Sequence, residues 1–144
     1  MDFQSLLFSF EGRIGRKTFW VWNVCYYAAI IILISLANTL VPLWAHLLVP
    51  VILLVLLYPD LAMTAKRWHD RNKSSWWLLL NVPLLIGRLA APVAASAADE
   101  PMMTWQTTIS FVALFCGVWI LVECGFLKGT PGENRFGPAV VSSS

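Results

Sequence analysis

Charged residues are scarce in this sequence of 144 residues. Asp, Glu, Lys and Arg make up 12% of it, whereas hydrophobic residues make up 58%. A soluble globular chain usually has about 25% charged and about 45–50% apolar residues. This imbalance predicts a membrane protein. The net charge of +2 is too small to indicate nucleic-acid binding, so we expect no nucleic acid among the partners.

Combinations of residues that would support redox, metal or catalytic chemistry are also lacking. The three cysteines, Cys25, Cys116 and Cys124, lie in apolar runs without a Cys-x-x-Cys spacing, as is typical of buried hydrophobic side chains. His69 and Asp70 are adjacent, and neighbouring residues of a helix point about 100° apart, so they do not form a His–Asp pair by themselves. No nucleophile or metal-ligand set accompanies them. The sequence therefore predicts neither an enzyme nor a cofactor nor a metal site.

We also expect no cleavable secretory signal, because the acidic Asp2 and Glu11 do not fit the basic start of a signal peptide. We therefore expect the apolar segments to remain in the mature protein. Four apolar residues follow the i, i+3, i+4, i+7 spacing of a helix: Phe3, Leu6, Leu7 and Phe10. This spacing predicts an amphipathic helix in the membrane interface, and a frayed basic tail is the alternative.

Four long apolar stretches are each compatible with a membrane-spanning helix, for which about 20 residues suffice. The predicted spans are residues 19–41, 43–63, 76–95 and 103–127. The third is the most interrupted, because Pro83, Gly87, Arg88 and Pro92 fall inside it. We therefore expect an all-α membrane protein with one four-span bundle over residues 1–138 and a flexible tail at 139–144.

The basic residues are sorted by side. With four spans, the N-terminal segment, the loop at 64–75 and the C-terminal tail share one side of the membrane. That side carries nine of the ten basic residues, and the two opposite loops carry none. Basic residues concentrate in cytoplasmic loops. Both termini are therefore expected to be cytoplasmic.

The stretch Asp60–Trp77, DLAMTAKRWHDRNKSSWW, connects the second and third spans. If the second helix continues past the membrane face, Asp60, Arg67 and Arg71 fall on one side of it, because steps of 7 and 11 residues return to nearly the same angle. Asp70 lies three residues from Arg67 and can reach it. The basic residues here could serve only topology and contact with lipid phosphate, or they could form a specific site for an anionic ligand.

Three ionisable residues lie within or at the edge of the predicted spans: Asp60, Arg88 and Glu123. A charge at the bilayer centre costs about 2.5–3.5 kcal/mol on insertion scales. Asp60 and Glu123 fall at similar depth near the cytoplasmic side, so we expect both to pair with Arg67. Such a cluster would hold the spans in register. The functional alternative is a small oligomeric transporter or ion-coupled carrier that uses the three ionisable residues.

The tail from Gly129 to Pro138 is rich in turn-forming residues. A phosphate-binding glycine loop would follow a strand and begin a helix, and this segment does neither, so a nucleotide loop is not indicated. We expect Asn134, Arg135 and Phe136 to fold back beneath the bundle. There they would cap backbone carbonyl groups of the 60–77 stretch or of the N-terminal segment.

Three motifs are spaced along the chain: FEGRIGRKTFW at 10–20, KRWHDRNKSSWW at 66–77 and GENRFGP at 132–138. In this order they resemble the hallmarks of the bacterial "domain of unknown function 805" family of inner-membrane proteins. That family usually has Arg, Leu and Gly where this chain has Lys66, Trp68 and Ser75. The resemblance covers nearly the whole chain and implies a multi-pass inner-membrane protein. It implies no known activity.

The sequence as a whole predicts a non-enzymatic four-helix bundle whose cytoplasmic face is built from the three motifs. This face would bind anionic lipid headgroups or a protein partner, including a second copy of the chain. The candidate residues on it are Arg13, Arg16, Asp60, Arg67, His69, Asp70, Arg71, Glu123, Asn134 and Arg135.

Overall fold

The computed structural model describes residues 3–87 and 104–140. Three helices in this part of the chain are long and apolar enough to cross a membrane: Arg16–Leu40, Pro42–Asp70 and Thr104–Phe126. A shorter apolar helix covers Ser75–Gly87. The all-helical membrane fold is therefore confirmed. The end of the predicted third span, with Arg88, lies outside the described residues, and the count of four spans stays a prediction.

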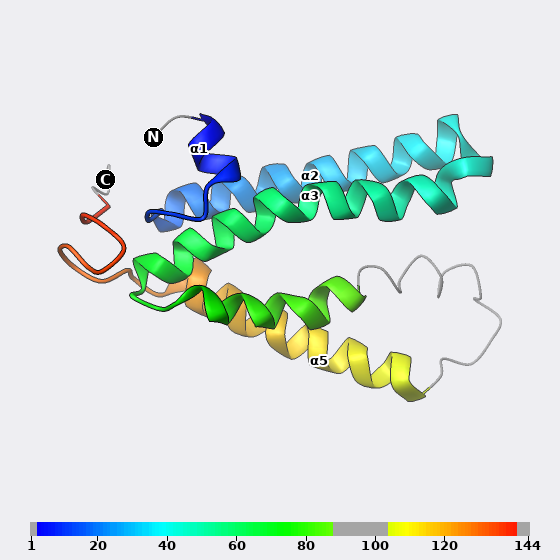
Figure 1. Ribbon diagram of the computed structural model, residues 1–144. Coiled ribbons are helices and arrows are strands. Elements are labelled where there is room, and N and C mark those ends of the chain that lie inside the picture. The colour runs from blue at the N-terminus through cyan, green and yellow to red at the C-terminus, as the bar shows by residue number, and fades with distance from the viewer. Residues whose placement is uncertain (1–2, 88–103, 141–144) are drawn as a thin grey trace.

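The first two long helices, α2 (Arg16–Leu40) and α3 (Pro42–Asp70), form an antiparallel hairpin (Figure 1). Pro42 begins α3, because a proline in the first helical turn needs no partner for a backbone N–H. The 29 residues of α3 extend about 44 Å, which exceeds a hydrocarbon core of about 30 Å. The helix α3 thus continues for seven residues past the predicted end of the span at residue 63.

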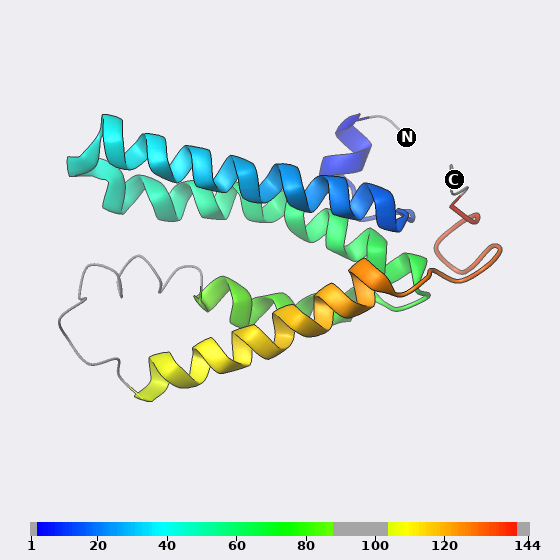
Figure 2. The same ribbon diagram turned by 180° about the vertical axis from the view of Figure 1, so that it is seen from behind.

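The second hairpin follows a turn in which Asn72 has a positive φ of 57°. It begins with the 3₁₀ helix η1 (Ser75–Leu80), which continues as an α-helix to Gly87. The return helix α5 (Thr104–Ile120) changes into a π-helix, η2 (Leu121–Phe126). Figures 1 and 2 show that the two hairpins lie together at the end where both termini are marked and separate toward the other end.

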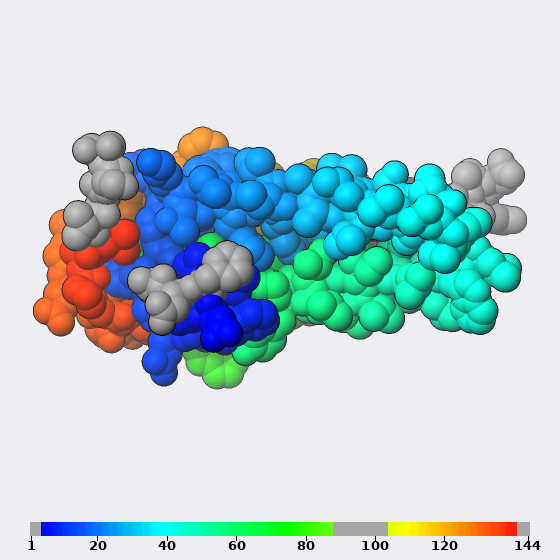
Figure 3. All heavy atoms as spheres, turned by 90° about the horizontal axis from the view of Figure 1, so that it is seen from above, coloured from blue at the N-terminus to red at the C-terminus, as the bar shows by residue number. Residues whose placement is uncertain are grey.

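The N-terminal helix α1 (Phe3–Phe8) packs on α3, and Figure 3 shows the N-terminal segment lying over the α2–α3 hairpin. Tyr58 of α3 donates a hydrogen bond to the carbonyl of Phe8 at 3.2 Å. A helix was expected here, and its location in the membrane interface stays a prediction. After α1, Gly12 adopts a φ of 94°, in the left-handed region that favours glycine. This turn directs the next residue, Arg13, into the bundle.

Two groups of buried apolar side chains hold the helices together. The smaller joins the C-terminal part of α2 to the first half of α3 through Ala37, Val49 and Leu53. The larger lies where the hairpins meet and consists of Ile14, Phe19, Met63, Trp68, Ile120 and Cys124. Many other large apolar side chains of α2, α3 and α5 face outward, as contact with lipid chains requires. We call the end formed by residues 10–18, the last turns of α3, η2 and the tail at 127–140 the polar end.

Candidate functional site

The polar end is organised around Asp70, the last residue of α3, which is only 4% exposed. Its Oδ1 accepts two hydrogen bonds from Arg13, from Nε at 3.1 Å and from Nη2 at 2.9 Å. Its Oδ2 accepts a hydrogen bond from Nη1 of Arg67, as the three-residue spacing predicted. Both arginines are buried. We call Arg13, Arg67 and Asp70 the Asp70 cluster, in which paired charges offset the cost of removing each from water.

Arg13 connects three distant parts of the chain. Besides Asp70, its guanidinium donates to the tail carbonyls of Thr130 at 2.8 Å, Gly132 at 2.8 Å and Gly137 at 3.2 Å. A planar guanidinium has five donors in a fixed fork, which suits this arrangement. These internal partners occupy the donors of Arg13, which was a candidate for contact with lipid headgroups.

Arg67 and Lys66 also bind acceptors inside the protein, and both residues are 0% exposed. Arg67 donates to the backbone carbonyls of Cys124 and Leu127 at the end of η2. Lys66 donates to two backbone carbonyls of α1, each at 2.6 Å. Cationic side chains satisfy carbonyl groups that a helix end leaves without partners. The donors of these two side chains are therefore directed to internal acceptors.

Glu123 lies in a second ion cluster, at the start of η2. Its carboxylate pairs with Arg71 at 2.9 Å and with Lys73 at 3.0 Å. The expected pairing of Asp60 and Glu123 with Arg67 is wrong, because Asp70 and the η2 carbonyls already occupy the Arg67 guanidinium. The helices are thus held in register by two separate ion clusters rather than by one.

The tail folds back onto the end of α3, as the sequence predicted. Asn134 donates to the carbonyl of His69 at 2.9 Å, and Arg135 donates to the carbonyl of Asn72 at 3.1 Å. The ring of Phe136 stacks on the His69 ring with centroids 3.9 Å apart and planes 4° apart. Asn134 and Arg135 thus cap carbonyl groups of the 60–77 stretch, as expected, whereas Phe136 contributes ring stacking and caps no carbonyl there.

One contact of His69 was not foreseen from the sequence. Its Nε2 lies 2.9 Å from Oγ of Ser75, while Nδ1 lies 3.3 Å from the carbonyl oxygen of Gly12. A Ser–His–Asp arrangement would place a carboxylate against Nδ1, but Asp70 binds Arg13 and Arg67 instead. Within the described residues, no three His, Cys, Asp or Glu side chains are grouped to hold a metal ion.

A basic pocket of about 870 Å³ opens at the polar end between the start of α2, η2 and the tail. The cationic side chains of Arg16, Lys17 and Lys128 line it and are exposed. Arg16 donates one hydrogen bond, to the carbonyl of Phe126 at 3.3 Å. Neither Lys17 nor Lys128 forms an ion pair with the part of the chain that the structure describes. We call this hollow the basic pocket.

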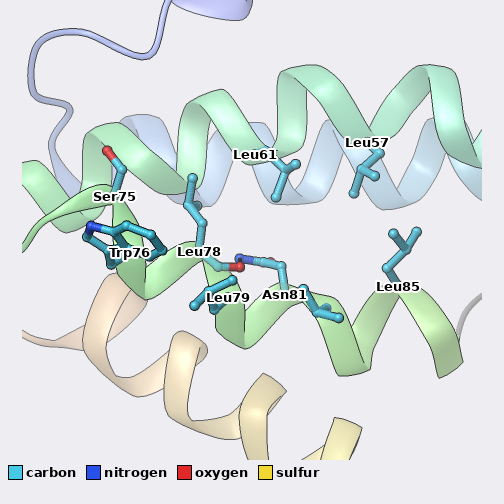
Figure 4. Close-up of a pocket in the computed structure, with 9 residues that line it drawn as sticks. Leu57, Leu61, Ser75, Trp76, Leu78, Leu79, Asn81 and Leu85 are labelled. Atoms are coloured by element: carbon cyan, nitrogen blue, oxygen red, sulfur yellow. Dashed lines mark hydrogen bonds between the residues drawn. The ribbon is translucent and has the colours of Figure 1, made fainter.

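Two further hollows lie along the helices. An apolar groove of about 370 Å³ separates α3 from residues 75–85, and Leu57 and Leu61 face Leu78 and Leu85 across it (Figure 4). The other is a cavity of about 690 Å³ between the two hairpins, lined in part by Asp60. Glu123 does not line this cavity. The cavity therefore does not include one of the ionisable residues on which the carrier alternative depends.

The apolar helices and the interlocked polar end define a helical membrane protein whose C-terminal tail is fixed to its helices by buried charges. The chain belongs to the family of proteins of unknown function named DUF805, which it matches over residues 7–138. The family resemblance seen in the three motifs is therefore confirmed.

Two relatives from Escherichia coli (strain K12) cover nearly all of the chain. The chain is 36% identical to the uncharacterized protein YiiR over 138 residues, which are 95% of this chain and 89% of YiiR. It is 25% identical to the inner membrane protein YhaH over 132 residues, which are 90% of this chain and 84% of YhaH. No solved structure matches the chain. The name of this second relative, an inner membrane protein, agrees with a membrane location.

Proposed function

We propose that this protein is a non-enzymatic protein of the bacterial inner membrane whose cytoplasmic face binds anionic lipid headgroups. The observation that supports this proposal is the basic pocket, in which three cations face an open hollow. The buried cations of the polar end have internal partners, whereas Lys17 and Lys128 keep their ammonium donors available to a ligand.

The orientation follows from the position of the basic residues. Nine of the ten lie in segments that form the polar end or adjoin it, and the hairpin end around Val41 carries none. Because basic residues concentrate on the cytoplasmic side, the polar end faces the cytoplasm. The basic pocket then lies beside the leaflet whose lipids carry negative charge.

Aromatic residues beside the pocket suit a lipid ligand rather than a soluble anion. Trp20 and Phe126 both line the pocket, with ring centroids 5.6 Å apart. Trp20 also donates to the carbonyl of Gly125 at 3.1 Å. Aromatic rings with one polar contact are favoured at the membrane–water boundary. A headgroup phosphate would thus meet the cations while the glycerol region meets the rings.

The test is lipid binding by the detergent-purified protein, measured by native mass spectrometry with phosphatidylglycerol and neutral phosphatidylcholine. We expect preferential retention of phosphatidylglycerol. A basic residue near an anionic surface contributes about 1 kcal/mol, which is about fivefold in affinity. Lys17→Gln and Lys128→Gln should each weaken phosphatidylglycerol binding by about this factor.

The matched control is Arg135→Gln, which removes one exposed positive charge from the same face but outside the basic pocket. Because Arg135 lies outside the pocket and donates to the carbonyl of Asn72, its loss should weaken phosphatidylglycerol retention less than the loss of Lys17 or Lys128 does. Equal retention of the two lipids, or an equal loss in the control variant, would overturn the proposal. The carrier alternative based on Asp60, Arg88 and Glu123 has less support, since Glu123 is held by Arg71 and Lys73 at the polar end.

A further inference from the structure

The contact between His69 and Ser75 joins a base to a hydroxyl group, and the basic pocket makes no use of it. Oγ of Ser75 lies 2.9 Å from Nε2 of His69, and Nδ1 of the same ring lies 3.3 Å from the carbonyl oxygen of Gly12. A carbonyl oxygen can only accept, so Nδ1 carries the ring proton and Nε2 of the neutral ring is an acceptor. The Ser75 hydroxyl therefore donates to Nε2, which is the geometry in which a histidine can take the proton of a serine.

The surroundings of His69 keep its ring neutral and fixed. The residue is 4% exposed, and burial disfavours the charged form of an imidazole. Phe136 stacks on one face of the ring, and the carbonyl of Gly12 holds Nδ1. Ser75, in contrast, is exposed, so a reactant can reach its hydroxyl.

The apolar groove between α3 and residues 75–85 begins at this hydroxyl. Figure 4 shows Ser75 at one end of the groove and Leu85 at the other. The segment between them extends roughly 15–20 Å, since it starts as a 3₁₀ helix and continues as an α-helix. All lining residues except Ser75 and Asn81 are hydrophobic. The groove thus accommodates an extended acyl chain whose carbonyl carbon lies at Ser75.

We propose that Ser75 is acylated by the thioester of a long-chain fatty acid, and that the attached chain occupies the apolar groove. The Ser75 hydroxyl adds to the thioester carbonyl while Nε2 of His69 takes its proton. The carbon–sulfur bond then breaks, the leaving thiolate takes the proton from Nε2, and the products are a Ser75 ester and a thiol. Because the acyl group stays on the chain, the modification is stoichiometric. The groove and the basic pocket share no lining residue, so this site does not depend on lipid binding there.

The test uses the detergent-purified protein with palmitoyl-coenzyme A or with palmitoyl acyl carrier protein as the donor. Intact-protein mass spectrometry should show the gain of one palmitoyl group, and fragmentation should locate it on Ser75. The donor that reacts faster identifies the source of the thioester. An acyl group already present on Ser75 of the purified protein supports the proposal equally.

Two results contradict the proposal at this stage. One is a Ser75 without an acyl group both before and after incubation with the two donors. The other is a palmitoyl group that neutral hydroxylamine releases, because this reagent cleaves the thioester of a cysteine and spares the ester of a serine.

Two substitutions test the roles of the hydroxyl and the base. Ser75→Ala should abolish the modification. The neighbouring hydroxyl of Ser74 is not the partner of His69, so Ser74→Ala is the matched control and should be modified normally. His69→Gln should slow the modification at least about 100-fold, as loss of a general base does. A palmitoyl group gained by Ser75→Ala, or an unchanged rate in His69→Gln, would refute the assignment.

A third substitution tests the groove, and it stays informative if His69→Gln fails to fold. Leu85→Trp narrows the far end, whereas Ile86→Trp adds an indole at an exposed neighbour outside the lining. Leu85→Trp should slow transfer from palmitoyl-coenzyme A by about tenfold and leave transfer from acetyl-coenzyme A unchanged. A folding defect would slow both donors alike. Equal palmitoyl transfer in Leu85→Trp and Ile86→Trp would show that the chain does not occupy the groove.

Discussion

The basic residues of the polar end divide into two kinds that the sequence does not distinguish. Arg13, Lys66 and Arg67 are buried and donate to internal oxygens, while Arg16 and Lys17 are exposed. The spacing along α3 predicted that Arg67 reaches Asp70, because residues three apart on a helix are neighbours. The contact with Arg13 depends on tertiary folding across 57 residues, and no local pattern contains it.

Arg13→Ala should therefore destabilise the protein strongly, although Arg13 lies in a segment outside the helices. Removing one partner of a buried ion pair typically costs about 3–5 kcal/mol, because the other charge stays buried. We expect a loss of this size in the free energy of unfolding, measured by denaturant titration in detergent. Arg13→Lys should restore only part of it, since an ammonium cannot reproduce the fork of donors.

Arg16→Ala is the control for that prediction, because the side chain belongs to the same motif but is exposed and donates one hydrogen bond. Its effect on unfolding should stay below about 1 kcal/mol. Equal losses for Arg13→Ala and Arg16→Ala would mean that the Asp70 cluster does not control stability.

The helices of the first hairpin were largely predictable, because long apolar runs and Pro42 mark their limits. The π-helix η2 was not, since no residue pattern in Leu121–Phe126 distinguishes it from a continued α-helix. The wider turn matters because Arg67 binds carbonyls at its end. Glu123 was assigned to Arg67 from depth alone, whereas the orientation of η2 places it against Arg71 and Lys73. The depth of a residue along its span thus predicts which residues lie near it, but not which of them it pairs with.

The segment after η2 approaches the end of α3 closely at Gly129. A Cβ at this position would overlap the carboxylate of Asp70. Gly129→Ala should therefore displace the tail from the Asp70 cluster and lower the free energy of unfolding by about 1–3 kcal/mol, as overpacking does. Proteolysis should then cleave the tail near Thr130 faster than in the unmodified protein.

Gly15→Ala provides the comparison for this substitution. A Cβ at Gly15 would meet only Val140, at an ordinary contact distance of 3.4 Å. Its stability and its tail cleavage should match those of the unmodified protein. If Gly129→Ala behaves in the same way, the close packing of the tail against Asp70 is not maintained in the membrane.

The assembled protein concentrates its ionisable groups at one end and its apolar surface along both hairpins. Charge sorting in the sequence predicted this arrangement, and the polar end brings the three motifs together as expected. The hollows were not predictable, because each is lined by residues from several helices whose relative rotation the sequence does not specify. Their linings also differ. The exposed cations Arg16, Lys17 and Lys128 line the basic pocket together with the paired Arg13 and Asp70, whereas Asp60 lines the cavity between the hairpins.

Orientation in the membrane gives the last prediction. If the polar end is cytoplasmic and the chain crosses four times, a reporter fused after Asp99 lies on the outer side, and one fused after Ser144 lies in the cytoplasm. Alkaline phosphatase is active only outside, and green fluorescent protein fluoresces only inside. We therefore expect phosphatase activity with the first fusion and fluorescence with the second. A fourth helix that did not cross would place both reporters outside, and loss of the third crossing would reverse the two readouts. In either case three crossings would remain, and the carboxyl-terminal cations Lys128 and Arg135 would lie opposite the N-terminal ones. That result contradicts a structure in which Arg13 binds the tail directly, so the fusions test the membrane topology and the architecture of the polar end together.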